Sequence, residues 1–159
     1  MKIVFIDDHP LVRKGPEMVL SKEEDFDIVG FADSGQKALE ILDKTRPDVA
    51  LVDLRLPGEH GLDIIKKAKE IHKDCKFIVL TSFATEEEIR RALDEEVDGY
   101  ILKESLPEEL INAVRMVYKG RKYYDPVVVQ YALSRSNSSP KTELDSLTPR
   151  EQEVLAALA

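Results

Sequence analysis

The chain has 159 residues, enough for one domain with a hydrophobic core and a short additional segment. Hydrophobic residues make up 43% of it, which excludes a disordered chain, and no apolar run is long enough to span a membrane. The net charge of -8 indicates no basic surface, so a role with DNA has to be inferred from a motif. Because no cleavable signal follows Met1, we expect a cytoplasmic protein that does not associate with a membrane.

Short apolar segments alternate with amphipathic segments along the first 121 residues. The predicted strands are residues 3–6, 26–32, 48–53, 76–80 and 99–102, and the helices that follow them are about 10–20, 34–44, 61–72, 85–97 and 107–119. Five such units predict an α/β fold with a parallel sheet, right-handed crossovers and helices on both faces.

Three of these helices carry further predictions. Pro16 lies inside the first helix, where a proline removes a hydrogen bond, so we expect a bend there. The helix at 61–72 should turn four apolar residues inward, namely Leu62, Ile65, Ala68 and Ile71. Thr85 and Glu88 form a capping box at the start of the next helix, whose apolar stripe is thin. We therefore expect that helix to be mobile.

The character of the chain changes after residue 121. Asp125 and Pro126 are typical of a helix start and predict a helix to Ser134, and residues 134–146 read as a flexible linker. Residues 147–155 begin another helix, with a capping box between Thr148 and Glu151. We expect the chain to stop before that helix has a partner.

Polar residues follow four of the five predicted strands: Asp7 and Asp8, Asp53, Thr81, and Lys103. The carboxyl ends of parallel strands meet at one edge of a doubly wound sheet, so these side chains should share a pocket. Three carboxylates that close repel one another unless a cation lies among them, and Mg2+ suits oxygen ligands. With the metal present, Asp53 could act as a nucleophile toward phosphorus, while Lys103 neutralises charge and Thr81 donates a hydrogen bond.

These residues resemble the receiver domain of two-component response regulators. The stretches Asp8-His9-Pro10-Leu11-Val12-Arg13 and Asp53-Leu54-Arg55-Leu56-Pro57-Gly58 resemble the NarL/FixJ subfamily, and residues 147–155 are similar to the start of a LuxR-type helix-turn-helix domain. The resemblance implies a flavodoxin-like, doubly wound, five-stranded sheet in the order 2-1-3-4-5 with a C-terminal helical extension. It also implies a receiver domain at 1–121, a connecting helix and linker at 122–146, and a truncated DNA-binding domain at 147–159.

The resemblance implies a role for each site residue. Asp53 would accept a phosphoryl group from a sensor histidine kinase, and Asp7 and Asp8 would hold Mg2+ with Asp53 and the main-chain carbonyl of Arg55. The residues that bind the phosphoryl group or switch with it would be Thr81, Ser82, Lys103 and Tyr100. Arg55 and Phe83 could obstruct an attacking water and tune the rate of dephosphorylation.

The implied output is control of transcription. Phosphorylation would favour a homodimer, and the full-length protein would bind promoter DNA through a domain that begins at Thr148, Pro149, Arg150 and Glu151. Such a protein is a switch and not a turnover enzyme. Two other classes stay open: a Mg2+-dependent hydrolase with an aspartyl-phosphate intermediate, and a binding module that is never phosphorylated.

The remaining candidate residues read as structural. His9, His60 and His72 have no metal-binding spacing, so surface or capping roles are expected. Cys75 is the only cysteine, which excludes an intrachain disulfide and favours a structural or surface thiol. The sequence contains no glycine-rich phosphate-binding or dinucleotide-binding motif.

Overall fold

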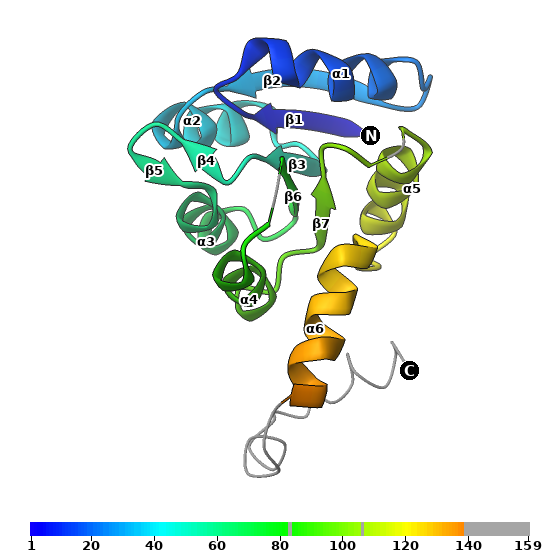
Figure 1. Cartoon of the computed structure of the whole chain (residues 1–159). Helices are drawn as coiled ribbons and strands as arrows, with labels where there is room; N and C mark the ends of the chain where they lie inside the picture. Colours follow the sequence, from blue (N-terminus) through cyan, green and yellow to red (C-terminus); the bar gives the residue numbers. More distant parts are fainter. Residues whose placement is uncertain (83, 106, 139–159) are drawn as a thin grey trace. The chain divides into compact units, whose positions relative to one another are not determined.

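The structure is a computed structural model that describes residues 1–82, 84–105 and 107–138, without the side chains of residues 10–13 and 135–138. Within this part, six parallel strands form one sheet (Figure 1). They are β1 (Lys2–Ile6), β2 (Asp27–Ala32), β3 (Val49–Val52), β6 (Lys76–Thr81), β7 (Gly99–Leu102) and β8 (Tyr123–Tyr124). Their order is β2-β1-β3-β6-β7-β8. The first five confirm the predicted flavodoxin-like arrangement, whereas the two-residue β8 is too short to have a sequence pattern and was not predicted.

Helices connect the strands and a small hairpin follows β3. The helices are α1 (Pro10–Ser21), α2 (Gly35–Thr45), α3 (Gly61–Ile71), α4 (Glu86–Asp94), α5 (Pro107–Tyr118) and α6 (Pro126–Ser138). The hairpin pairs β4 (Arg55–Leu56) with β5 (Glu59–His60), and it was also not predicted. It lies between β3 and α3, and its last residue, His60, directly precedes the first residue of α3.

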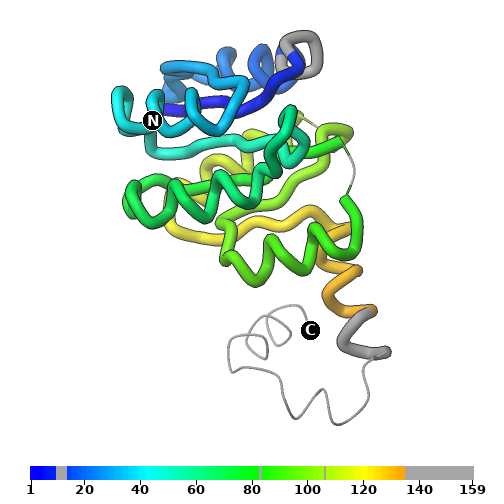
Figure 2. The backbone as a smooth tube through the Cα atoms, turned by 90° about the vertical axis from the view of Figure 1, so that its left-hand side faces the viewer, coloured from blue at the N-terminus to red at the C-terminus, as the bar shows by residue number. Residues whose placement is uncertain are grey.

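The sheet separates two apolar layers because successive strand residues point to opposite faces. One layer packs the sheet against α1 and α5 and includes Ile3, Phe5, Val49, Leu51, Ile78, Leu80, Ile101, Leu20, Leu110, Ala113, Val114 and Val117. The alternate strand residues, among them Val4, Ala50, Val79 and Tyr100, are fully buried on the other side. Figure 2 shows α3 and α4, both in green, side by side along the front of the strands. Strands buried on both faces explain the continuous apolar runs in the sequence.

The helices follow the predictions with specific exceptions. Helix α1 contains Pro16 in its interior, and the bend expected there stays a prediction. Leu62, Ile65 and Ala68 are buried as expected, but Ile71 is 64% exposed. It is the last residue of α3, where the helix has passed the edge of the core, so its predicted burial was wrong. The capping box at the start of α4 is confirmed, and the mobility of α4 stays a prediction.

The C-terminal segment differs from its prediction in length. Asp125 accepts a hydrogen bond from the backbone N–H of Val127, so it caps α6 as expected. Helix α6 continues to Ser138, so a linker beginning at Ser134 was wrong by four residues. Met1–Tyr124 form one compact unit and α6 belongs to another part of the chain. The rest of the linker and the predicted helix start at Thr148 lie outside the described residues, and the domain boundaries stay predictions.

Two further expectations concern single features. In the part of the chain that the structure covers, no helix has the length and apolar character needed to cross a membrane. Cys75 is buried, and that burial raises the pKa of its thiol to about 12. It is therefore a structural thiol and not a surface one.

Candidate functional site

The carboxylates at the edge of the sheet are held by the strand ladder itself. The backbone N–H of Asp7 donates to Ala32 at 2.8 Å, and that of Asp53 donates to Ile6 at 2.8 Å. Both residues therefore continue β1 and β3 by one position, and both are buried, with 4% and 5% of their surface exposed. This is the carboxyl edge that the sequence predicted for them.

Lys103 joins these two carboxylates. Its backbone N–H donates to the carbonyl of Thr81 at 2.7 Å, which aligns it with the end of β6. Its Nζ donates to Asp7 Oδ2 at 2.9 Å and to Asp53 Oδ2 at 3.0 Å. Burial alone would lower the pKa of Lys103, but the hydrogen bonds and charges of both carboxylates outweigh it and raise that pKa. The lysine is therefore charged at neutral pH.

A divalent cation fits the remaining negative charge. Asp7, Asp8, His9 and Asp53 each offer one ligand atom, and these atoms lie within 4.8 Å of one another. Asp8 Oδ1 is buried and finds no hydrogen-bond donor of suitable geometry among the described residues, although His9 Nδ1 lies 2.7 Å from it. Three carboxylates and one lysine leave uncompensated negative charge, and carboxylate oxygens are the ligands that Mg2+ prefers. The residues present thus fit a Mg2+ site.

The histidines have more contacts than the sequence predicted. His9 has an exposed side chain, as expected, yet its ring also lies against the acidic cluster, which its position after Asp8 could have indicated. His60 caps α3 by accepting a hydrogen bond from the backbone N–H of Leu62. It also contacts Glu88 on α4, which the sequence did not reveal. His72 is the C-cap residue that follows α3, so it has a capping role.

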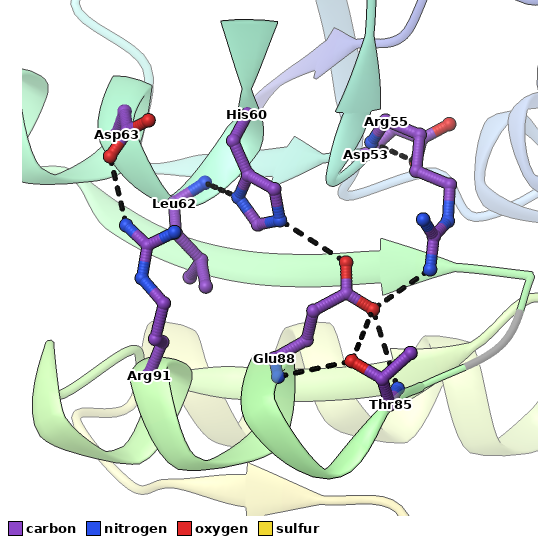
Figure 3. Close-up of polar contacts among 8 residues, drawn as sticks. All are labelled: Asp53, Arg55, His60, Leu62, Asp63, Thr85, Glu88 and Arg91. Atoms are coloured by element: carbon purple, nitrogen blue, oxygen red, sulfur yellow. Dashed lines mark hydrogen bonds and ion pairs between the residues drawn. The ribbon is translucent and has the colours of Figure 1, made fainter.

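The side chain of Arg55 is turned from Asp53 toward α4. Its backbone N–H donates to Asp53 Oδ1 at 3.1 Å, but its Nη2 donates to Glu88 Oε1 at 2.8 Å (Figure 3). The sequence predicted Arg55 beside the phosphoacceptor and interpreted Glu88 only as a capping residue. Glu88 is buried, with 7% of its surface exposed, and is the residue that the sequence analysis missed.

The other residues predicted to bind the phosphoryl group or to switch with it differ in how deeply they are buried. Thr81 ends β6 and is 1% exposed, and Ser82 beside it is exposed. Tyr100 is completely buried in β7, and its hydroxyl has no hydrogen-bond partner within the described part of the chain. Burial, followed by the negative charge of Glu88, raises the pKa of Tyr100. Phe83 lies outside the described residues.

Comparison with known proteins identifies the family. The model of the response regulator receiver domain matches residues 3–115. The chain belongs to this family. The VraR response regulator of Staphylococcus epidermidis is 36% identical over 160 residues, covering 100% of this chain and 76% of VraR. The nitrate/nitrite response regulator NarL of Escherichia coli is 31% identical over 160 residues, covering 99% of this chain and 74% of NarL.

Solved structures agree with this assignment. A LuxR-family response regulator from Aurantimonas has a TM-score of 0.79 and 26% identity, covering 85% of this chain and 97% of that one. The receiver domain of a putative NarL from Mycobacterium tuberculosis has a TM-score of 0.71 and 33% identity. The match covers 76% of this chain and 97% of that one. The receiver domain described above is therefore that of a NarL/LuxR-type response regulator, as the sequence motifs indicated.

Proposed function

We propose that this receiver domain is phosphorylated on Asp53 by a sensor histidine kinase and thereby controls transcription. The observation that carries this proposal is the contact of Asp53 Oδ2 with Lys103 Nζ at 3.0 Å inside a cluster of carboxylates. A buried nucleophilic carboxylate with a lysine beside it and clustered oxygen ligands for Mg2+ combines the groups that phosphoryl transfer needs.

In the proposed reaction, each of these groups has a distinct role. A carboxylate oxygen of Asp53 attacks the phosphorus of a phosphohistidine, the phosphorus–nitrogen bond breaks, and the kinase imidazole leaves with its electron pair. Lys103 exchanges its bond to Asp53 for one to a phosphoryl oxygen while it keeps Asp7. Asp7, Asp8, Asp53 and the main-chain carbonyl of Arg55 would hold Mg2+, which would supply further charge neutralisation. The hydroxyl of Thr81 then donates to the phosphoryl group.

The output is a change in assembly. Phosphorylation shifts an existing equilibrium between inactive and active forms, with Tyr100 and Ser82 responding to Thr81, and favours a homodimer. The relatives include DesR of Bacillus subtilis, which is described as a transcriptional regulatory protein. Promoter DNA would be bound by the full-length protein through the domain that begins near Thr148. Arg55 and Phe83 slow the loss of phosphate, so the protein acts as a switch and not as a turnover enzyme.

The test uses a small-molecule phosphodonor. Acetyl phosphate with Mg2+ should add one phosphoryl group to the wild-type chain and none to Asp53→Ala, as measured by intact mass, and the oligomeric state should increase. Failure of the wild type to gain mass would contradict the proposal and favour a binding module. Rapid, continuous release of phosphate would instead favour a hydrolase. Beryllofluoride with Mg2+ provides a second check, because only a phosphorylation switch should change its amide exchange.

A further inference from the structure

The carboxylate of Glu88 binds both ends of the hairpin that follows the phosphoacceptor. Arg55 of β4 donates to Oε1 at 2.8 Å, and Nε2 of His60 in β5 lies 3.1 Å from Oε2. Arg55 and His60 are themselves paired across the hairpin. Glu88 lies in the first turn of α4, 33 residues from Arg55. A single side chain therefore ties the segment after Asp53 to α4 (Figure 3).

These contacts exceed what helix capping requires. The capping box uses the backbone N–H of Thr85, 3.3 Å from Glu88 Oε1, and the backbone N–H of Glu88, 3.2 Å from Thr85 Oγ1. An exposed glutamate could satisfy both bonds. Glu88 is instead buried and turns its second oxygen to His60 while it also accepts from Arg55. A buried carboxylate needs such partners, so its position depends on the hairpin.

The contacts of Glu88 also determine where the positive charge of Arg55 lies. Arg55 is two residues beyond Asp53, and its backbone N–H already contacts that carboxylate at 3.1 Å. Its guanidinium is nevertheless held on Glu88. A phosphoryl group carries more negative charge than a carboxylate and accepts paired hydrogen bonds from arginine. Phosphorylation of Asp53 would therefore compete with Glu88 for the same guanidinium.

We infer that Glu88 is a positioning residue that holds Arg55 away from Asp53, and that phosphorylation transfers Arg55 from Glu88 to the phosphoryl group. This inference rests on the proposed phosphorylation of Asp53. The transfer leaves Glu88 without one of its two hairpin partners and loosens the tie between the hairpin and α4. Tyr100 lies within the electrostatic reach of Glu88, and none of the residues that the structure describes forms a hydrogen bond with its buried hydroxyl. Loss of the Arg55 bond therefore also changes the surroundings of Tyr100.

The test is a double-mutant cycle on the lifetime of phospho-Asp53. The 159-residue chain is loaded with acetyl phosphate and Mg2+, the donor is removed, and phosphorylated protein is followed by intact mass. Glu88→Gln frees Arg55 to shield the phosphoryl group from water, so the lifetime should lengthen by about threefold or more. Arg55→Ala should shorten the lifetime, and Glu88→Gln should have no further effect in that background. Glu88→Asp keeps the charge and should stay close to wild type.

Asp63→Asn is the matched control. Asp63 accepts a hydrogen bond from Arg91 at 2.8 Å and so ties α3 to α4 without contacting Arg55 (Figure 3). Its removal should leave the lifetime unchanged. Equal effects of Asp63→Asn and Glu88→Gln, or an effect of Glu88→Gln that persists in Arg55→Ala, would show a merely structural role and overturn the inference. A wild-type chain that accepts no phosphoryl group would instead overturn the proposed function, and the inference with it.

Discussion

The ammonium group of Lys103 lies 3.0 Å from a carboxylate oxygen of Asp53, across 50 residues of sequence. Its second bond, to Asp7 at 2.9 Å, makes it the cation between two buried acids. The side chains of all three residues are less than one tenth exposed. Each depends on the others, because removal of one partner from a buried ion pair leaves an uncompensated charge.

Lys103→Met should destabilise the protein strongly when Mg2+ is absent. The methionine fills similar space but leaves Asp7 and Asp53 without their cation, so we expect a loss of about 3–5 kcal/mol in the free energy of unfolding. Urea denaturation in the presence of a chelator measures this loss of stability. Lys37→Met is the control, because Lys37 forms an exposed pair with Asp33 and should cost less than about 1 kcal/mol. Similar losses in both variants would contradict a special role for Lys103.

Mg2+ should stabilise the wild type and not Asp8→Asn. At about 100 times its dissociation constant, a ligand adds about 2.7 kcal/mol to the free energy of unfolding. Without Mg2+, Asp8→Asn should be more stable than wild type by about 1 kcal/mol, because it removes one of three clustered negative charges. Urea denaturation with Mg2+ and with chelator tests both effects. Asp43→Asn, on the exposed side of α2, should respond to Mg2+ like the wild type.

Glu88 should make stability depend on pH. Burial alone would raise the pKa of Glu88, but hydrogen bonds from His60 and Thr85 and the charge of Arg55 outweigh it and hold the pKa below 4.5. A carboxyl group whose pKa is lowered by folding stabilises the protein above its unfolded pKa, and this contribution is lost as the pH falls through the folded pKa. Wild type should therefore exceed Glu88→Gln in stability near pH 7, and the difference should shrink once the pH drops below 4.5.

Urea denaturation of both proteins across this range provides the measurement. Glu87→Gln is the control, because Glu87 is an exposed neighbour in the same helical turn and should change stability by no more than about 0.5 kcal/mol. A stability difference between wild type and Glu88→Gln that does not vary with pH would mean that packing, and not the charge of Glu88, stabilises the network.

Gly61→Ala should disturb the backbone beneath the phosphoacceptor. A Cβ at Gly61 would lie 2.3 Å from the carbonyl oxygen of Asp53 and 2.8 Å from Leu54 Cα, and neither atom can move without shifting the chain. We expect a loss of about 3 kcal/mol in the free energy of unfolding and slower phosphorylation. Gly35 also begins a helix, but a Cβ there meets only the end of the Glu59 side chain, so Gly35→Ala should cost about 1 kcal/mol. Thermal denaturation and the rate of phosphorylation by acetyl phosphate should distinguish Gly61→Ala from Gly35→Ala.

Local sequence patterns predicted most of the strands and helices, because the interactions that form these elements involve residues close together in the chain. Apolar runs bounded by turns located the five main strands, and the capping residues Thr85 and Asp125 located two helix starts. Such signals fail where the decisive neighbours are distant. Ile71 fits the apolar stripe of α3 yet is exposed, since the helix extends past its support. The short β8 pairs with β7, and the backbone N–H of Tyr123 donates to the carbonyl of Asp98, 25 residues earlier in the chain.

The functional site shows the same difference between what nearby residues determine and what distant residues determine. The sequence by itself determined that Asp7, Asp53 and Lys103 meet, because the end of a parallel strand fixes the edge on which a residue lies. Only the tertiary structure decided where the side chain of Arg55 points, since Glu88 and His60 are separated by 28 residues and meet through the packing of α4 beside α3. No local pattern records that the guanidinium of Arg55 pairs with Glu88 and not with Asp53, because Glu88 is 33 residues away in the sequence.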